Sequence, residues 1–215
     1  MAVSKVPPRI FEWTRPVPRE QWDASNPALL NAAKPYEEIE QKIGYTFQDK
    51  GFLLAAFTHC SLPANARIVP CILQPMDHLG DALLKFLLSA KLYGCLHPLS
   101  PRSLHDARKH VDSNYSFGLA AARNGFHRFL RSGSPALSEA VVGYVRGLEN
   151  ADYPGNRNHV PPKPLADVFE ALAAAIYLDS HQDLATMWRS LFPMLRPHVD
   201  YEVASVAAAS ALYFF

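Results

Sequence analysis

Two aspartates stand four residues apart in the apolar stretch of residues 76–88. On a helix, positions four apart share one face with Cβ atoms about 5–6 Å apart, so Asp77 and Asp81 would point the same way. Apolar residues fill most of the remaining circumference, which predicts a helix that is buried nearly all round. Burying two carboxylates among leucines is unfavourable unless a cation or a donor compensates them. In the alternative interpretation, Asp81 caps a helix that begins near Ala82, and Asp77 belongs to the preceding turn.

A second apolar stretch, residues 163–179, repeats this design. Asp167 and Glu170 stand three apart on an alanine-rich segment opened by Pro164, whose missing N–H costs little at a helix start. Two helices that each offer a carboxylate pair meet the requirement of a metal site in a helical bundle. Carboxylates about 5 Å apart repel by roughly 3 kcal/mol at an effective dielectric of about 20, so four together would bind protons or cations. Ligation by oxygen alone favours Mg²⁺ or Mn²⁺ over zinc.

Helix and loop signals place the elements that must position these acids. Helices are expected over residues 35–43, 50–58, 77–93, 135–147 and 184–191, and another should open at Pro101. Residues 61–75 and 149–162 have the composition of loops. Residues 1–34 contain five prolines and are expected to form an extended arm, and residues 201–215 an apolar tail. The domain between them, residues 35–200, shows no convincing strand, so the expected fold class is all-α.

Composition limits the classes of function. A chain of 215 residues, 49% of them hydrophobic, suffices for one core. Its formal net charge of +1 provides no global basic field, so any surface that binds nucleic acid must be local. Cys60, Cys71 and Cys95 lack close paired spacing, which predicts reduced thiols in an intracellular protein, in the cytoplasm or nucleus with an organelle left open. The longest uncharged apolar run, residues 203–215, is too short to span a bilayer as a helix, and no membrane partner is expected.

The two acidic stretches resemble the signatures of the ribonuclease III domain. Residues 79–84, Leu-Gly-Asp-Ala-Leu-Leu, match the first signature, and Asp167, Phe169, Glu170 and residues 175–180 match the second. The likeness covers roughly residues 35 to 200 and is strongest to the C-terminal ribonuclease III domain of Dicer-type enzymes. It implies the all-α ribonuclease III endonuclease fold. It also implies a metal-dependent endoribonuclease that cleaves double-stranded RNA by phosphodiester hydrolysis, in RNA processing or silencing.

The resemblance also assigns roles to individual residues. The metal-binding acids of the family correspond to Asp77, Asp81, Asp167 and Glu170, which would hold Mg²⁺ or Mn²⁺ and, together with Lys163, form the catalytic set. Six basic residues lie between positions 102 and 131 against two aspartates, either as a solvated face or as a surface for RNA phosphates. The resemblance favours the second interpretation. The RNA-binding candidates are Arg102, Arg108, Lys109, Asn114 and Arg128.

Departures from the family pattern keep a second function open. Asp77 stands where the family usually has glutamate, which shortens its reach by one carbon–carbon bond, about 1.5 Å. A misplacement of about 1 Å can lower a rate on the order of 10²-fold, so impaired rather than absent activity is expected. Ala166 and Ala174 replace glycines that allow close helix approach. The alternative function is therefore a catalytically impaired RNA-binding or scaffold subunit of a larger ribonucleoprotein or Dicer-like complex.

The resemblance implies a protein partner as well as RNA. The family cleaves duplexes with two such domains whose sites face opposite strands, and this chain holds one. A homodimer, or a heterodimer with another ribonuclease III domain, is therefore expected. The apolar helix that carries Asp77 and Asp81 would form the interface.

Overall fold

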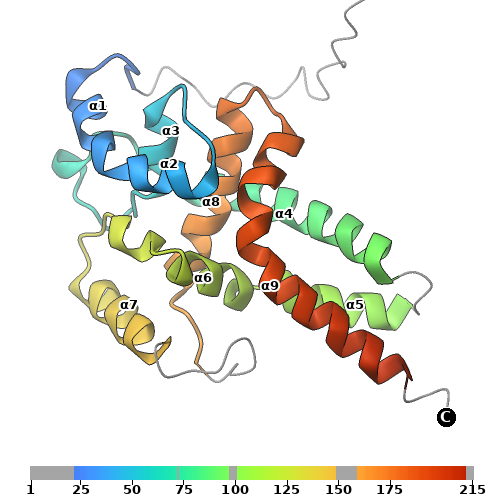
Figure 1. Cartoon of the computed structure of the whole chain (residues 1–215). Helices are drawn as coiled ribbons and strands as arrows, with labels where there is room; N and C mark the ends of the chain where they lie inside the picture. The colour runs from blue at the N-terminus through green and yellow to red at the C-terminus, as the bar shows by residue number, and fades with distance from the viewer. Residues whose placement is uncertain (1–21, 72, 97–100, 149–158, 212–215) are drawn as a thin grey trace, which may run out of the picture.

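The computed structural model describes residues 22–71, 73–96, 101–148 and 159–211, and within these ranges the fold is all-α, as expected (Figure 1). One helix, α8 (Lys163–Asp179), runs through the centre, and its residues 165–177 are all buried. Four helices pack around it: α3 (Lys50–Ala56), α4 (Leu73–Leu96), α6 (Asn114–Arg123) and α9 (Leu184–Ala211). The only strand-like pairing in the described ranges is an isolated bridge between Thr58 and Arg131.

The observed elements include all the expected helices, together with two unexpected ones over residues 27–33 and 114–123. In chain order they are α1 (Pro27–Ala33), η2 (Lys34–Tyr36), α2 (Glu37–Ile43), α3 (Lys50–Ala56), η3 (Ala64–Ala66), α4 (Leu73–Leu96), α5 (Pro101–Val111), α6 (Asn114–Arg123), η4 (Phe126–Phe129), α7 (Pro135–Leu148), α8 and α9 (Leu184–Ala211). Helix α2 ends at Gly44, whose φ of 63° is a conformation that glycine adopts without strain. Because α4 contains both Asp77 and Asp81, the alternative in which Asp81 caps a helix is wrong.

A buried aspartate fastens the loop between α2 and α3 to the end of α8. The Asp179 side chain is fully buried, and it accepts hydrogen bonds from the Tyr45 hydroxyl at 2.7 Å and from the backbone N–H groups of Gln48 at 2.8 Å and Asp49 at 2.9 Å. Asp49 in turn caps α3 by accepting from the N–H of Gly51. These bonds satisfy a carboxylate that would otherwise be costly to bury.

Helices α4 and α8 cross with their backbones in contact at Gly80. A Cβ atom built on Gly80 would lie 1.8 Å from the carbonyl oxygen of Glu170 and 3.2 Å from the backbone nitrogen of Ala174. Only a glycine permits this approach, because any side chain would overlap the α8 backbone. The crossing therefore fixes α4 directly against the segment of α8 that carries Asp167 and Glu170.

One face of α4 is exposed, so the expectation of a helix buried nearly all round is wrong. Phe86 and Tyr93 retain 62% and 60% of their surface, and Leu79 and Leu83 are only partly buried. The opposite face, with Leu84 and other apolar residues, packs into the core. Apolar composition alone does not distinguish a face that packs inside the domain from one that no part of the described chain covers.

The N-terminal and C-terminal segments also differ from expectation. Residues 27–33 form α1 and pack on α3, rather than belonging to an extended arm, while residues 1–21 lie outside the described residues. Helix α9 continues through Pro193 and Pro197 to Ala211, well beyond the expected end at residue 191. Burial of Leu195 and Val199 offsets the loss of two backbone donors. No helix in the described ranges has the length and apolarity needed to cross a membrane.

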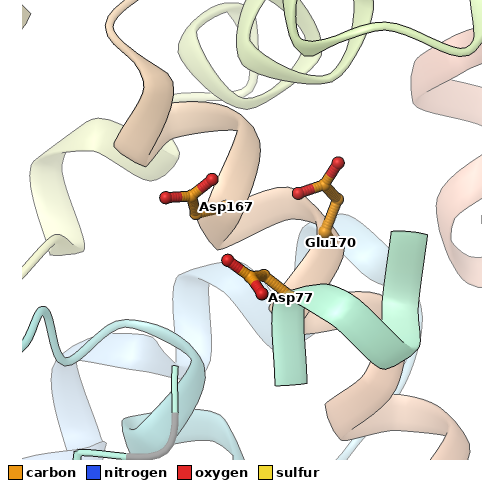
Figure 2. Close-up of side chains that lie close together, drawn as sticks. All are labelled: Asp77, Asp167 and Glu170. Atoms are coloured by element: carbon orange, nitrogen blue, oxygen red, sulfur yellow. The ribbon is translucent and has the colours of Figure 1, made fainter. Parts of the chain in front are cut away.

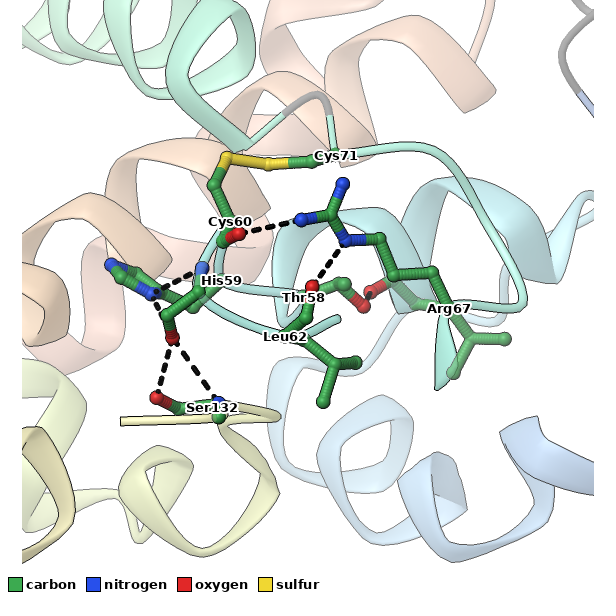
Figure 3. Close-up of a disulfide and its surroundings, with 10 residues drawn as sticks. Thr58, His59, Cys60, Leu62, Arg67, Cys71 and Ser132 are labelled. Atoms are coloured by element: carbon green, nitrogen blue, oxygen red, sulfur yellow. Dashed lines mark hydrogen bonds between the residues drawn. A yellow bond between two sulfur atoms is a disulfide. The ribbon is translucent and has the colours of Figure 1, made fainter. Parts of the chain in front are cut away.

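The loop before α4 is closed by a disulfide, so the expectation of three reduced thiols is wrong for two of them. Cys60 and Cys71 are joined, with Cα atoms 5.4 Å apart, whereas Cys95 is free and exposed (Figure 3). Arg67 holds the intervening loop by donating from Nη2 to the Cys60 carbonyl at 2.5 Å and from Nε to the Leu62 carbonyl at 2.6 Å. The 11-residue separation between Cys60 and Cys71 did not indicate a disulfide in the sequence. The loop between them must fold back before the two thiols can meet.

Gly80→Ala is expected to destabilise the domain by roughly 1–3 kcal/mol, because α4 and α8 must separate to admit the methyl group. Urea unfolding measures the change. Gly94→Ala is the matched control on the same helix, since a Cβ there meets nothing within 4 Å. It should raise stability by about 0.5–1 kcal/mol through helix propensity. Equal effects of the two substitutions would contradict the close crossing.

Candidate metal centre

Three of the four predicted acids meet where α4 crosses α8. Asp77 comes from α4, Asp167 and Glu170 come from α8, and one carboxylate oxygen of each lies within 4.8 Å of the others (Figure 2). Asp167 and Glu170 retain only 8% and 6% of their surface, and Asp77 is half-buried. Three convergent carboxylates of this kind fit one hard divalent cation that keeps some of its waters.

The short side chain of Asp77 reaches this group. Asp77 precedes Gly80 by three residues, so the backbone contact at Gly80 carries it toward α8. The spacing of Asp167 and Glu170 places both on the side of α8 that faces α4 (Figure 2). Asp77 therefore joins the same group as Asp167 and Glu170 despite its shorter side chain.

Burial and mutual repulsion both disfavour negative charge on this group. Burial, followed by the charges of Asp81, Asp167 and Asp77, raises the pKa of Glu170 to about 8. Burial and the charge of Asp167 also raise the pKa of Asp77. A cation that replaced the proton would relieve both effects, which is an independent indication that the residues fit a metal ion.

Lys163 supplies a positive charge at the exposed edge of the group. Its ammonium donates to the Asp167 carboxylate, which lies one turn along α8. Burial lowers the pKa of Lys163. The hydrogen bond and the charge of Asp167 together raise the pKa by more than burial lowers it, so the net shift is upward. Lys163 therefore remains charged and neutralises part of the negative charge of the cluster. It lies beside the acids, where the sequence analysis expected it.

Asp81, the fourth predicted acid, contributes no oxygen to this group. It pairs instead with Lys85, whose Nζ lies 2.7 Å from Asp81 Oδ2. Its charge still acts on the cluster, since it is the largest electrostatic contribution to the raised pKa of Glu170. Sequence reasoning missed Lys85, although an acid four residues before a lysine on a helix is a recognisable pairing signal.

Asp112 is a second residue near the cluster that sequence reasoning missed. It lies between α5 and α6, and its Oδ1 atom is buried without a hydrogen-bond partner in the structure. Burial raises its pKa, against the opposing charge of Lys85, and Asp81 raises it further. Asp112 therefore faces the same ammonium as Asp81.

The structure divides the predicted RNA-binding residues into two places. Arg102, Arg108 and Lys109 are exposed on α5, and Asn114 is exposed at the start of α6. Arg128 lies on η4 instead. There its guanidinium pairs with Glu38 of α2 and lies 5.3 Å from the centre of the Phe129 ring. Arg102, Arg108 and Lys109 thus lie exposed on α5, which packs against α4 and α9, whereas Arg128 has local partners elsewhere.

Comparisons with known proteins agree with this geometry. The model of the ribonuclease III domain family matches residues 74–181. Endoribonuclease Dcr-1 of Drosophila melanogaster is 35% identical over 179 residues, which are 77% of this chain and 8% of Dcr-1. Endoribonuclease Dicer of Danio rerio is 33% identical over 214 residues, which are 91% of this chain and 11% of that protein. The chain thus spans about a tenth of the length of the curated relatives it matches.

Two solved structures share the fold. One structure of the nuclease domain of ribonuclease III from Campylobacter jejuni superimposes with a TM-score of 0.56 at 23% identity, covering 77% of this chain and 96% of that one. A second, from the same organism, gives a TM-score of 0.53 at 24% identity, covering 74% of this chain and 99% of that one. At this identity the likeness establishes the fold.

The metal-free protein is expected to lose stability as pH rises from about 4.5 to about 8, the usual and folded-state pKa values of Glu170. Across this window the folded state keeps a proton that the unfolded chain has released. The free energy of unfolding should therefore fall by up to about 1.4 kcal/mol per pH unit. Melting temperature against pH in a chelator measures the slope. Glu170→Gln should flatten it and Glu139→Gln, an exposed change on α7, should not. Equal slopes in all three proteins would contradict the assignment.

Proposed function

The chain belongs to the ribonuclease III domain family, and from this we propose that it is a metal-dependent endoribonuclease domain that hydrolyses phosphodiester bonds in double-stranded RNA. One observation carries the proposal: the carboxylates of Asp77, Asp167 and Glu170 converge within 4.8 Å at a helix crossing. Its relatives from Drosophila melanogaster and Danio rerio are named endoribonucleases.

The proposed chemistry divides roles among residues of this chain. Asp77, Asp167 and Glu170 would hold Mg²⁺ or Mn²⁺. Such an ion, when bound, polarises phosphate oxygens and lowers the pKa of water. Lys163 holds the Asp167 carboxylate in place, and its largely exposed ammonium can donate to a phosphate oxygen at the edge of the group.

The exposed basic residues of α5 are the proposed contacts for the RNA backbone. Arg102, Arg108 and Lys109 are exposed there, and α5 packs beside α4, which carries Asp77. Contacts of such residues with phosphates release counterions, so RNA binding should weaken as salt increases. An affinity for duplex RNA that is independent of salt would contradict these contacts.

We propose that the exposed stripe on α4 is the interface with a second ribonuclease III domain. Leu79, Leu83, Phe86, Ala90 and Tyr93 follow one another at intervals of four and three residues, the spacing of side chains that pack against a partner helix. One of the Campylobacter jejuni structures is described as having a flexible region involved in dimer formation. A second copy of this chain is the simplest partner, and another ribonuclease III domain is the alternative.

The site favours cleavage over a role as an inactive scaffold, because Asp77 reaches the other two acids. With Mg²⁺, the protein is expected to cut long duplex RNA, and Asp167→Asn should reduce the rate by at least roughly 100-fold through loss of several kcal/mol of charge stabilisation. RNA binding should persist, since phosphate contacts dominate affinity. Mg²⁺ should also raise the melting temperature of the wild type but not of Asp167→Asn.

Asp200→Asn is the matched control for this experiment, because Asp200 is an exposed acid on α9 that pairs with Arg196 of the same helix. It should leave both cleavage and the response to Mg²⁺ unchanged. If the wild type cleaves no duplex, even when a compatible partner domain is supplied, the protein is the RNA-binding scaffold instead.

Self-association should depend on the stripe. Phe86→Glu places a charge at an exposed position of the stripe and should convert a micromolar dimer into a monomer, as measured by sedimentation velocity. Val142→Glu, at an exposed position on α7, should leave the dimer intact. A strict monomer in the wild type would exclude a homodimer and direct the search to a different ribonuclease III domain.

A further inference from the structure

The disulfide between Cys60 and Cys71 joins two segments that the fold holds in different ways (Figure 3). On one side, the His59 N–H donates to the Arg131 carbonyl at 2.9 Å, and the Arg131 N–H donates to the Phe57 carbonyl at 2.8 Å. Cys60 therefore directly follows a segment that backbone hydrogen bonds fix without any help from the sulfur atoms.

On the other side, Cys71 stands just before the start of α4, the helix that carries Asp77. The backbone contact at Gly80 fixes α4 against α8 three residues beyond Asp77. Asp77 thus lies between two anchors, and the first turn of a helix, with N–H groups that lack helical acceptors, opens more easily than its interior. Burial of Leu73 and Met76 keeps α4 in the core, so loss of the disulfide would loosen this turn without unfolding the domain.

The two cysteines are placed for exchange with small thiols. Cys60 and Cys71 both retain part of their surface. Arg67 donates to the Cys60 carbonyl, which brings a cation to this end of the loop, and a cation near a cysteine favours the reactive thiolate. The sequence predicts an intracellular protein, and disulfides that form in reducing compartments are usually transient or redox-sensing.

We propose that Cys60 and Cys71 form a redox switch that controls the start of α4. In the disulfide form, the first turn of α4 is held in place and Asp77 stays in the acidic group. In the dithiol form, the loop of residues 61–70 opens, the first turn loosens, and the group binds a divalent ion more weakly. The effect on the ion rests on the proposed metal-dependent function, whereas the change in the loop and the helix does not.

The exchange balances with glutathione as the redox partner. One cysteine thiolate attacks a sulfur of oxidised glutathione and releases a glutathione thiolate, which leaves a mixed disulfide. The thiolate of the other cysteine then attacks the cysteine sulfur of that mixed disulfide and releases the second glutathione. Two cysteine thiols are oxidised, one glutathione disulfide is reduced, and the two protons pass to the departing glutathione thiolates. Reduced glutathione reverses both steps.

Thiol trapping with a maleimide in glutathione buffers tests the switch. Cys95→Ser removes the free cysteine, so only Cys60 and Cys71 can be labelled, and both should gain label as the buffer becomes more reducing. Reduction should speed trypsin cleavage after Arg67 by at least roughly tenfold, because the disulfide restrains the open loop. Amide hydrogen exchange should become faster in residues 73–77 but not in residues 84–92, where α4 packs in the core.

Two outcomes of these measurements would overturn the switch. One is a disulfide that survives a large excess of reduced glutathione, since it would then be a permanent staple. The other is unchanged hydrogen exchange in residues 73–77 after complete reduction, because the disulfide would then not control the start of α4.

Calorimetric titration with Mn²⁺ tests the link to the acidic group. Cys60→Ser combined with Cys71→Ser imitates the dithiol form without an added thiol that would itself bind metal. It should bind Mn²⁺ at least about threefold more weakly than the oxidised wild type, because apparent affinity scales with the fraction of protein that has Asp77 in place. Cys95→Ser is the matched control and should bind with wild-type affinity.

The titration separates the switch from the proposed function. Equal Mn²⁺ affinities in the oxidised wild type and in the double serine variant would overturn the link between the disulfide and Asp77, and leave the metal centre intact. Absence of Mn²⁺ binding in every protein would overturn the metal centre, while trapping and hydrogen exchange would still decide the switch.

Discussion

The backbone contact between α4 and α8 is the constraint on which the site depends. Gly80 lies so close to the Glu170 carbonyl that no side chain fits between them. This contact brings a half-buried aspartate on one helix against two buried acids on the other. Repulsion among the carboxylates opposes the contact, whereas apolar packing along the rest of both helices favours it. The acids are therefore held together by the core and not by their own attraction for one another.

The surrounding helices serve this crossing in different ways. Helix α8 is surrounded by protein along almost its whole length, so Asp167 and Glu170 have little freedom to separate. Helix α4 is packed on one face only, and its other face carries the apolar stripe. Helix α4 thus extends from the interior of the domain to its proposed partner surface. A substitution in the stripe therefore changes the same helix that carries Asp77.

Local patterns in the sequence predicted the acids and most helices, because i, i+3 and i+4 spacing depends only on helix geometry. Three features required tertiary structure. Asp81 was assigned to the metal group by resemblance, and only the structure shows its pairing with Lys85. Helix α9 passes two prolines because Leu195 and Val199 find a buried place to pack. Cys60 and Cys71 meet because Arg67 folds their loop back.

The buried carboxylate of Asp179 sets the axial position of α8. It sits nine residues beyond Glu170, about 13 Å along the helix at about 1.5 Å per residue, and it is anchored by three donors from the loop between α2 and α3. A slip of α8 by a single residue would shift its acids by about 1.5 Å, comparable to the misplacement of about 1 Å that can cost on the order of 10²-fold in rate. Asp179, far from the acidic group, thereby limits how far Asp167 and Glu170 can move along the helix axis relative to Asp77.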